Sequence, residues 1–369
     1  MRQKQAFFTI MLIVALSISN SLNAQKKPNT ASAPNLIIIT TDGLRWQEVF
    51  NGMDFALANN KKFNHGDSAY LFKKYGAATV TERQSKLLPF ITQTMGTKGL
   101  LFGNRFKENK VDVVNPHWFS YPGYNEIFTG YPDSAINSNN YPPNPHQNVL
   151  AFLNQQKAYQ NKVIAFGAWD AYNRILNEAA SGFTVINGFE NLLPILDDPQ
   201  TKIIANMLKD SYKPFKEAEC LDVFTHHQAK YYLETKRPKV MYISYGETDE
   251  WAHEGNYSAY LDAANQVDAW VAGIWQWVQN TPGYKDNTYL LITTDHGRGF
   301  AEDWTDHGAD VKGASSIWFG LMGPEKNSNL NKIKQSSSQQ LYQKQLAATM
   351  AKLLGLQFTA THPIGEAIY

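Results

Sequence analysis

The chain has 369 residues, with 34 Lys and Arg against 33 Asp and Glu, and 43% of its residues are hydrophobic. This near-neutral balance argues against a nucleic-acid groove or a polybasic membrane patch, and the apolar content is ordinary for a globular protein with a large core. The single cysteine, Cys220, excludes an internal disulfide framework and thiolate metal clusters.

The N-terminal segment has the layout of a secretory signal peptide. Basic residues precede an apolar run at 6–18, and Ala24 stands before the expected cleavage at Gln25. A membrane anchor is the alternative, but the apolar run is short for a bilayer span. We therefore expect a signal peptide at 1–24 and a mature protein at 25–369 that works in the periplasm or outside the cell, with no stable membrane anchor after cleavage.

Beyond a polar leader, apolar runs alternate with helical patterns along the chain. Continuous apolar runs, typical of buried parallel strands, lie at 35–41, 162–167, 239–246, 288–294 and 316–323. Helical patterns lie at 83–96, 146–156, 258–279 and 337–355. This alternation predicts one α/β domain, with a mostly parallel central sheet and helices on both faces. The interval 176–236 has weaker strand signals, and a small lid insertion is left open there.

Three of the predicted strands lead to an aspartate, and these are Asp42, Asp249 and Asp295. A single strand-end aspartate is more often a helix cap or turn residue than a ligand. In open parallel sheets, however, ligands bind beyond the carboxyl ends of the strands. The repetition after three strands therefore predicts that the three carboxylates face one crevice.

Histidines accompany these aspartates: His253 lies four residues after Asp249, His296 adjoins Asp295, and His307 follows in the next loop. Imidazole and carboxylate together suit zinc. Six such groups exceed one tetrahedral site but form two sets of three, and two metals about 4 Å apart would clamp a phosphoryl group during displacement. We predict two zinc ions, with manganese or iron as alternatives. The competing interpretation is six unrelated polar residues.

The segment NPHWFSYPGYNEIFTG, at 115–130, offers a nucleophile. A short extended run leads to Ser120, and Pro122 and Gly123 open a helical pattern that ends at Gly130. Ser120 is thus expected at a helix N-terminus, where amides and the helix dipole favour an anion. A metal-bound hydroxyl loses its proton readily. We predict that Ser120 is the nucleophile, and the alternative is a plain helix cap.

With these residues in place, the chain resembles the alkaline phosphatase superfamily, and most of all its type I phosphodiesterase/nucleotide pyrophosphatase branch. The motifs that carry the resemblance are TTDGLRW, FSYPGYNEIFTG followed by YPDSAINSNN, TDEWAH, and TTDHG with a later DHG. The resemblance covers about 35–325. The SYPGY stretch also resembles the sulfatase motif C/S-x-P-x-R, but it lacks the arginine, and the histidine-rich ligand set argues for zinc over the sulfatase calcium.

The resemblance implies one zinc held by Asp249, His253 and His307. It implies a second zinc held by Asp42, Asp295, His296 and Ser120. It also implies an asparagine amide at a non-bridging phosphate oxygen, for which Asn139 fits best while Asn137 and Asn140 stay open. Ser120 would form a covalent phosphoseryl enzyme that water then hydrolyses. Threonine is the usual nucleophile of that branch, so the serine puts the substrate class, though not the mechanism, in doubt.

The substrate class depends on residues whose roles have two interpretations. Arg174 would place a cation at the terminal oxygens of a phosphomonoester, or it would be a solvated helix-face residue. Four aromatic residues would form an apolar wall for the second substituent of a diester, or would pack in the core: Tyr121, Tyr124, Trp169 and Tyr172. We expect a small-molecule phosphodiester or nucleotide-type substrate. A broad phosphomonoesterase is the alternative, and a sulfate or phosphonate ester hydrolase or a non-catalytic metal-binding module is less favoured.

Overall fold

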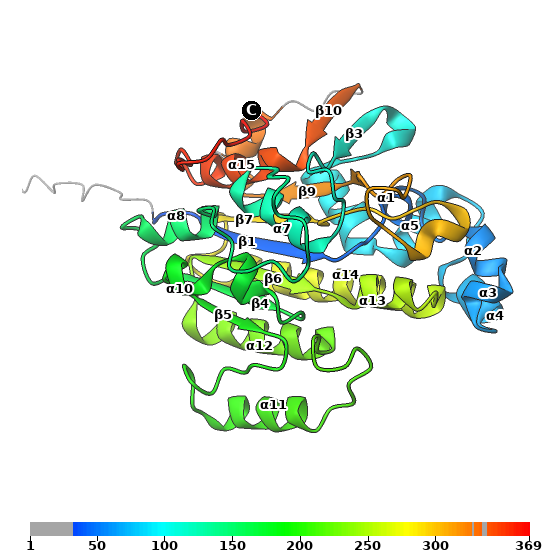
Figure 1. Cartoon of the computed structure of the whole chain (residues 1–369), viewed down its shortest axis with the longest axis horizontal. Coiled ribbons are helices and arrows are strands. Elements are labelled where there is room, and N and C mark those ends of the chain that lie inside the picture. The colour runs from blue at the N-terminus through cyan, green and yellow to red at the C-terminus, as the bar shows by residue number, and fades with distance from the viewer. Residues whose placement is uncertain (1–31, 327, 334–337) are drawn as a thin grey trace, which may run out of the picture. The chain divides into compact units, whose positions relative to one another are not determined.

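The computed structural model describes residues 32–326, 328–333 and 338–369, so the expected signal peptide lies outside the described residues. Within 33–369, helices pack against both faces of one central sheet (Figure 1). Among the described helices, we find none that combines the length and the apolar content needed to cross a membrane.

Seven strands form the central sheet, in the order β2-β9-β7-β1-β6-β4-β5. In that order they span Leu100–Phe102, Phe319–Met322, Thr288–Thr293, Asn35–Thr41, Val240–Tyr245, Val163–Gly167 and Thr184–Asn187. Neighbours from β7 to β5 run parallel, whereas β9 is antiparallel to both β7 and β2. Every residue of β1, β6 and β7 is buried. The predicted α/β class with a mostly parallel sheet is therefore confirmed.

Two helical layers cover the sheet, because alternate residues of a strand such as β1 point to opposite faces. One face packs against α7, α8, α9 and α15, which span Ser120–Thr129, Val149–Gln155, Tyr172–Ile175 and Leu346–Leu353. The other face packs against α1, α2, α3, α4, α5, α12, α13 and α14, which span Trp46–Asn51, Phe55–Asn59, Lys61–Asn64, Ser68–Tyr75, Val80–Leu87, Asp222–Lys236, Glu247–His253 and Tyr257–Asn280.

Two predicted helices differ in the structure. The pattern at 83–96 is divided into α5 and a π-helix, η1, at Phe90–Met95. Pro89 separates them, because proline has no N–H to donate and disfavours a helical conformation in the residue before it. The prediction for 337–355 was wrong in its first part, since Gln339–Tyr342 is strand β10. A short strand that pairs at a sheet edge has too few residues to show its period in the sequence.

Strand β10 belongs to a second sheet of three strands, in the order β10-β3-β8. Strands β3 and β8 span Asn109–Asp112 and Ser316–Ile317. The apolar run predicted at 316–323 is therefore shared, because its first two residues join the small sheet and Phe319–Met322 form β9 of the central sheet. This small sheet lies on the side of α15 and α7 (Figure 1).

The interval 176–236, for which the sequence left a small lid insertion undecided, supplies parts of the main fold. Its strand β5 forms one edge of the central sheet, and α12 contacts β4 and β6. Helix α11, at Pro199–Lys209, packs on α12 and lies farthest from the sheet (Figure 1). The strand was missed because four residues are too few to show a clear pattern.

Asp268 of α14 fixes the start of η1. Its two carboxylate oxygens accept hydrogen bonds of 2.8 Å from the backbone amides of Phe90 and Ile91, and all three residues are buried. We expect Asp268→Ala to lower the free energy of unfolding by about 2–5 kcal/mol, because two buried amides lose their acceptors. Gln266→Ala, an exposed change on the same helix, is the control in denaturant unfolding and should change stability by less than about 0.5 kcal/mol. Equal stability of the two variants would contradict this role.

Candidate metal centre

The predicted ligands lie together at the carboxyl ends of β7, β1 and β6, which are neighbours in the sheet. Asp42 directly follows β1, Asp249 lies in α13 just after β6, and Asp295 follows β7. Two groups of three residues each place ligand atoms within 4.8 Å of one another. The first group is Asp42, Asp295 and His296, and the second is Asp249, His296 and His307.

His296 is the centre of the first group. Its Nε2 lies 3.3 Å from Asp42 Oδ1 and 3.4 Å from Asp295 Oδ2, and all three residues are buried. Its Nδ1 donates a hydrogen bond of 2.9 Å to the carbonyl oxygen of Gly297. In the neutral imidazole this leaves Nε2 without a proton, so its lone pair points at the two carboxylates and can bind a metal.

The second group is arranged around Asp249. His253 Nε2 lies 3.1 Å from Asp249 Oδ2 and 3.0 Å from His307 Nε2. His296 Nε2 is 3.7 Å from Asp249 Oδ1, so His296 stands between the two groups. The trio of Asp249, His253 and His307 that the family resemblance implies is therefore brought together, and one turn of α13 places Asp249 and His253 on the same side.

The buried carboxylates of the centre favour the binding of cations. Burial, and then the charge of Asp249, raise the pKa of Asp42, while burial and the charge of Asp42 raise the pKa of Asp295. Asp42 Oδ1 and Asp295 Oδ2 are buried and accept no hydrogen bond from the described residues. Burial and the charge of His296 lower the pKa of His307 to about 2, which keeps its imidazole neutral. Carboxylate oxygens without hydrogen-bond donors, close to imidazole nitrogens, are ligands that a divalent metal binds, so the residues fit two adjacent metal sites.

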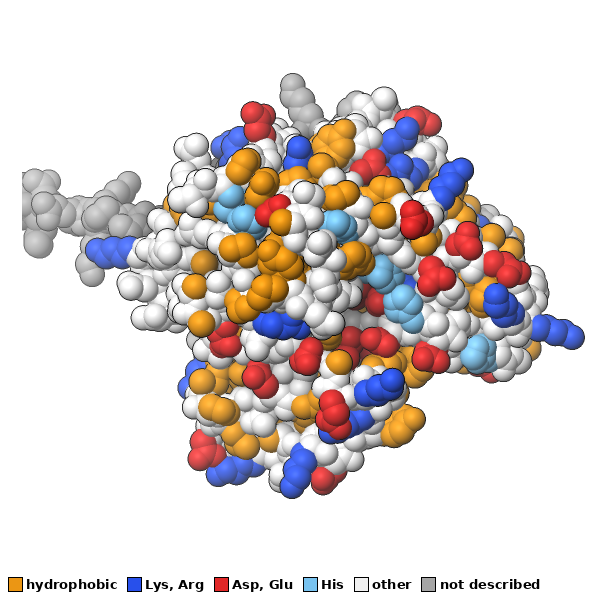
Figure 2. All heavy atoms as spheres, viewed as in Figure 1, with side chains coloured by type: hydrophobic (Ala, Val, Ile, Leu, Met, Phe, Trp, Pro, Cys, Tyr) orange, Lys and Arg blue, Asp and Glu red, His pale blue; other side chains and the backbone are white. Residues whose placement is uncertain are grey.

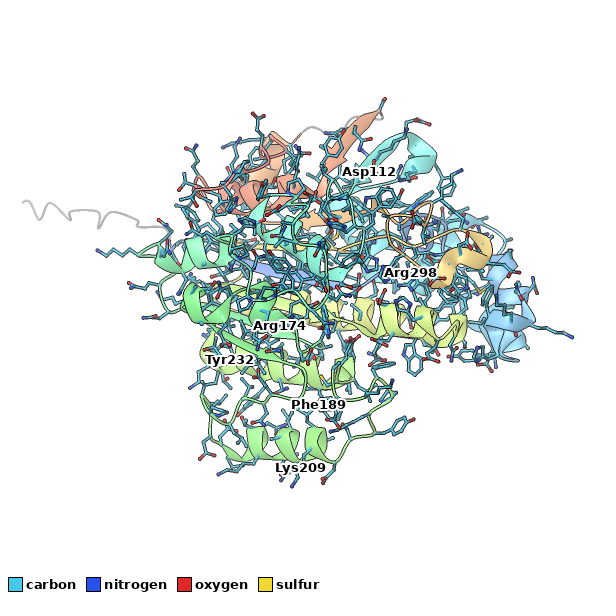
Figure 3. The ribbon with its side chains drawn as sticks, viewed as in Figure 1. Asp112, Arg174, Phe189, Lys209, Tyr232 and Arg298 are labelled. Carbon is cyan, nitrogen blue, oxygen red and sulfur yellow. The ribbon has the colours of Figure 1, made fainter. Side chains whose placement is uncertain are left out.

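Arg298 links Asp249 of the second group to the segment that leads to His307. Its guanidinium forms an ion pair with Asp249, and its Nε donates a hydrogen bond of 2.9 Å to the carbonyl oxygen of Trp304. Burial alone would raise the pKa of Asp249, but the charge of Arg298 and then that of His253 lower it well below its ordinary value. Arg298, which is labelled in Figure 3, therefore holds Asp249 ionised and anchors the segment that leads to His307.

Ser120 is the first residue of α7, and its side chain does not cap the helix. The cap residue is Phe119, which makes no side-chain capping bond. Ser120 Oγ instead lies 3.4 Å from His296 Nε2. Gly123 permits this approach, because a Cβ atom at its position would overlap the carbonyl oxygen of Asp295. The hydroxyl thus lies beside the first ligand group.

Asn139 contacts the residue that follows Ser120. Its Oδ1 accepts a hydrogen bond of 3.0 Å from the backbone amide of Tyr121. Arg174 supports this loop, since its Nη1 donates hydrogen bonds to the carbonyl oxygens of Asn139, at 3.4 Å, and Tyr141, at 2.6 Å. Arg174 is therefore a loop-bracing residue, a role that differs from both interpretations of its place in the sequence.

The aromatic residues proposed for a substrate wall are mostly core residues. Tyr121, Tyr124 and Tyr172 are each at most 2% exposed. The Tyr121 hydroxyl donates to the carbonyl oxygens of Pro142 and Arg174, so its polar end is also inside. Only Trp169 of the four keeps partial exposure. The packing interpretation holds for the three tyrosines, because a buried ring offers no surface to a substrate.

Tyr124 has a role that the sequence did not reveal. It lies one helical turn after Ser120, and its hydroxyl donates a hydrogen bond of 2.9 Å to Asp42 Oδ2. We expect Tyr124→Phe to weaken metal binding about tenfold, because the carboxylate loses the partner that orients it. Tyr172→Phe is the matched control, since its hydroxyl bonds Ser244 and touches no ligand. Metal affinity is measured by competition with a chromogenic chelator, and equal affinities of the two variants would refute the orienting role.

Other residues that hold the ligands come from distant parts of the chain. Gln343 Nε2 donates a hydrogen bond of 2.7 Å to the carbonyl oxygen of Asp295, and Thr248 Oγ1 donates to the carbonyl oxygen of Asp42. The backbone amide of Gly43 donates a hydrogen bond of 3.2 Å to Asp295 Oδ1. Gly43 has a positive φ of 58°, so the glycine in TTDG was a usable signal. Gln343 has no local signature in the sequence.

Comparisons with known proteins agree with this geometry. Residues 217–357, which contain Asp249, Asp295 and the three ligand histidines, match the family model of the metalloenzyme superfamily. No curated protein sequence matches the chain. The chain therefore shares its carboxyl-terminal ligand region with a superfamily of metalloenzymes, whereas the phosphodiesterase branch stays a prediction.

Several solved structures have the same fold. Wild-type alkaline phosphatase PafA has a TM-score of 0.56 at 11% identity, with 92% of this chain and 99% of that chain covered. A putative sulfatase from Bacteroides thetaiotaomicron has a TM-score of 0.55 at 16% identity, covering 89% and 72%. Phosphonate monoester hydrolase of Agrobacterium radiobacter has a TM-score of 0.52 at 13% identity, covering 91% and 76%. The fold is therefore alkaline phosphatase-like.

Proposed function

We propose that this chain is a metal-dependent phosphoric ester hydrolase that prefers diesters and uses Ser120 as its nucleophile. The observation that carries the proposal is the position of Ser120 Oγ, 3.4 Å from His296 Nε2 at the start of α7. The hydroxyl faces two adjoining groups of metal ligands. The solved structures of similar fold include an alkaline phosphatase, a putative sulfatase and a phosphonate monoester hydrolase, which supports ester hydrolysis as the reaction class.

The ligand residues form two proposed metal sites. One metal would be held by Asp42, Asp295, His296 and Ser120, and the other by Asp249, His253 and His307. When bound, the metals would supply Lewis-acid stabilisation of the phosphoryl oxygens and lower the pKa of the Ser120 hydroxyl. We propose zinc because imidazole and carboxylate ligands suit it.

Ser120 Oγ attacks phosphorus, the bond from phosphorus to the leaving alcohol breaks, and the phosphoryl group stays on Ser120. Water then attacks the same phosphorus and returns the serine hydroxyl. The backbone amide of Ser120 and the side-chain amide of Asn139 would donate to the non-bridging oxygens, and Asn139 is oriented for this by the hydrogen bond that its Oδ1 accepts from the Tyr121 amide.

The preference for diesters rests on the arginines. A monoester dianion carries one more negative charge than a diester and benefits from an additional cation. Three arginines lie in or after the predicted motifs, and each has a partner within the protein: Arg174 Nη1 donates to loop carbonyls, Arg298 pairs with Asp249, and Arg45 pairs with Glu48. A monoanionic ester therefore suits the centre better. The second candidate is a broad phosphomonoesterase, favoured by the full-length similarity in fold to an alkaline phosphatase.

The test compares kcat/KM for two substrates that share a leaving group, 4-nitrophenyl phosphate and the 4-nitrophenyl diester of thymidine 5′-phosphate. The zinc-loaded mature protein should cleave the diester faster, and a chelator should stop both reactions. Faster cleavage of the monoester would replace the diesterase by the phosphomonoesterase. Chelator-sensitive activity on neither would overturn the proposal. We also propose a periplasmic or extracellular location, which fractionation of cells that express the full chain would test.

A further inference from the structure

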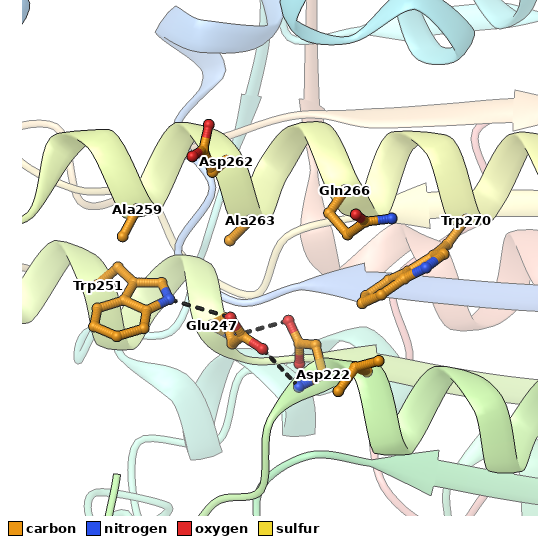
Figure 4. Close-up of a pocket in the computed structure, with 9 residues that line it drawn as sticks. Asp222, Glu247, Trp251, Ala259, Asp262, Ala263, Gln266 and Trp270 are labelled. Carbon is orange, nitrogen blue, oxygen red and sulfur yellow. Dashed lines mark hydrogen bonds between the residues drawn. The ribbon is translucent and has the colours of Figure 1, made fainter. Parts of the chain in front are cut away.

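A groove of about 390 Å³ lies between the first turns of α12 and α13 and one side of α14. Its lining includes Asp222, Glu247, Trp251, Ala259, Ala263 and Trp270 (Figure 4). The two alanines are one turn apart on α14, and their small side chains leave room between the tryptophans. None of the lining residues is a predicted metal ligand, so the groove is separate from the metal centre.

Trp251 and Trp270 stand at the two ends of the groove, with Glu247 and Asp222 between them in the view of Figure 4. Trp251 Nε1 donates a hydrogen bond of 3.1 Å to Glu247 Oε2. The Trp270 ring stacks on the buried imidazole of His226, with the ring centroids 4.6 Å apart. Both indoles keep partial exposure. They are therefore aromatic surfaces already fixed in place, which a ligand can contact at little cost in side-chain entropy.

The groove carries negative charge, and no Lys, Arg or His is among the described residues that line it. One of its three carboxylates, Asp262, forms an ion pair of 2.9 Å with Lys74. In the described part of the chain, Asp222 and Glu247 form no ion pair. Over the face shown in Figure 2, by contrast, basic and acidic side chains are interspersed. The ligand whose charge complements this groove is a cation.

The hydrogen-bonding groups of the groove favour one kind of cation. Asp222 is buried, so Glu247, which is partly exposed, is the carboxylate that a ligand meets. It lies at the edge of the Trp251 ring, because that ring donates to it. A guanidinium group is planar and can lie over an indole while its N–H groups donate to a carboxylate, whereas an ammonium group is a point charge. The groove therefore suits an arginine side chain better than a lysine.

An apolar hollow of about 250 Å³ adjoins the groove, because Val223 lines both. The hollow lies between α11 and α12. Ile203 and Met207, which also line it, are 54% and 58% exposed. A free arginine molecule has no group for this surface. A polypeptide, however, can place an arginine in the groove and a nearby apolar side chain in the hollow.

We propose that the groove between α12, α13 and α14 binds an arginine side chain of a partner polypeptide. The guanidinium group would lie on the Trp251 ring and donate to Glu247. An apolar side chain close to that arginine would enter the hollow beside Ile203 and Met207. The site lies outside the metal centre, so its ligand does not depend on the proposed reaction.

The test uses the full chain labelled with 5-fluorotryptophan, in which nine tryptophans give nine fluorine resonances. Trp251→Phe and Trp270→Phe assign the two signals of the groove. N-acetyl-arginine N-methylamide should shift these two signals and leave the others in place. N-acetyl-citrulline N-methylamide has nearly the same shape without the charge, and it should bind at least about fivefold more weakly. Added salt should reduce this difference.

A charge-removing substitution locates the effect at the carboxylate. Glu247→Gln should lower the affinity for the arginine probe about fivefold and remove its advantage over citrulline, because the shape is kept and one negative charge is lost. Glu254→Gln is the matched control, since Glu254 directly follows the same helix, is exposed and does not line the groove. It should bind both probes like the wild type. Circular dichroism shows whether each variant is folded, and the comparison of the two probes needs no variant.

Four short peptides test the second contact, and in them leucine follows arginine directly or after one, two or three glycines. At least one peptide should bind about fivefold more tightly than the arginine probe, because the leucine adds apolar contact in the hollow. Met207→Ser should remove this gain. Ile195→Ser is the control, since Ile195 is also an exposed apolar residue but does not line the hollow.

The outcomes decide between occupants. Unmoved Trp251 and Trp270 signals, or equal affinities for the arginine and citrulline probes, would overturn the proposal. An unchanged affinity in folded Glu247→Gln protein would also overturn it. If the arginine probe bound through Glu247 but none of the peptides bound more tightly, the groove would be a site for a small guanidinium compound, and the polypeptide partner would be wrong.

Discussion

Replacing Ser120 by alanine should lower kcat/KM for phosphodiesters about a thousandfold or more and leave the fold intact. The side chain makes no capping bond, so the helix does not need it. Its hydroxyl lies 3.4 Å from His296 Nε2, where we propose that it attacks phosphorus. Losses of this size are usual when a nucleophile is removed, because the remaining site can still bind substrate. Steady-state kinetics and the metal content of the purified variant are measured together.

Ser134→Ala provides the control, because Ser134 is exposed in the loop that follows α7. It should retain wild-type activity. If Ser120→Ala kept its metal and still hydrolysed the diester at a rate near that of the wild type, Ser120 would not be the nucleophile.

Replacing Gly123 by alanine should have an effect nearly as large, without touching a reacting atom. Alanine inside a helix normally stabilises it by about 1 kcal/mol relative to glycine. Here its methyl group would overlap the carbonyl oxygen of Asp295, a backbone atom at the end of β7 that cannot move freely. Helix α7 would have to withdraw, which would carry Ser120 away from His296. We expect kcat/KM to fall about a hundredfold, because small displacements of reacting groups are costly in rate.

Gly273→Ala in α14 is the matched change, because a Cβ atom at that position meets nothing within 4 Å. It should keep full activity and raise the thermal midpoint slightly. Wild-type activity in Gly123→Ala would show that α7 does not need its close approach to β7.

The sequence predicts the strand ends well, for a physical reason. Strands β1, β6 and β7 are buried on both faces, so they are apolar without interruption and their limits are visible. The first polar residues after them fall at one edge of a parallel sheet. This is why the pattern of residues is enough to place Asp42 and Asp295 in one crevice.

The residue roles that the sequence does not predict depend mostly on tertiary packing. Tyr121 and Tyr172 carry no mark that tells a pocket wall from a core, and the structure buries both. Tyr124 looks like them in sequence, yet its hydroxyl holds Asp42 because α7 passes close to β1. Glu219 precedes α12 in a segment without a motif, and a β-bridge to Trp169 holds it at the end of β4.

The most direct test of the central claim is the mass of the protein after acid quenching during turnover of the 4-nitrophenyl diester of thymidine 5′-phosphate. Peptide mapping then locates any adduct. The account predicts a thymidine phosphoryl group on Ser120. This adduct should form in the presence of metal and should not form when a chelator is added before the substrate. Metal-dependent turnover with Ser120 unmodified at every quench time, or with the adduct on another residue, would contradict the account.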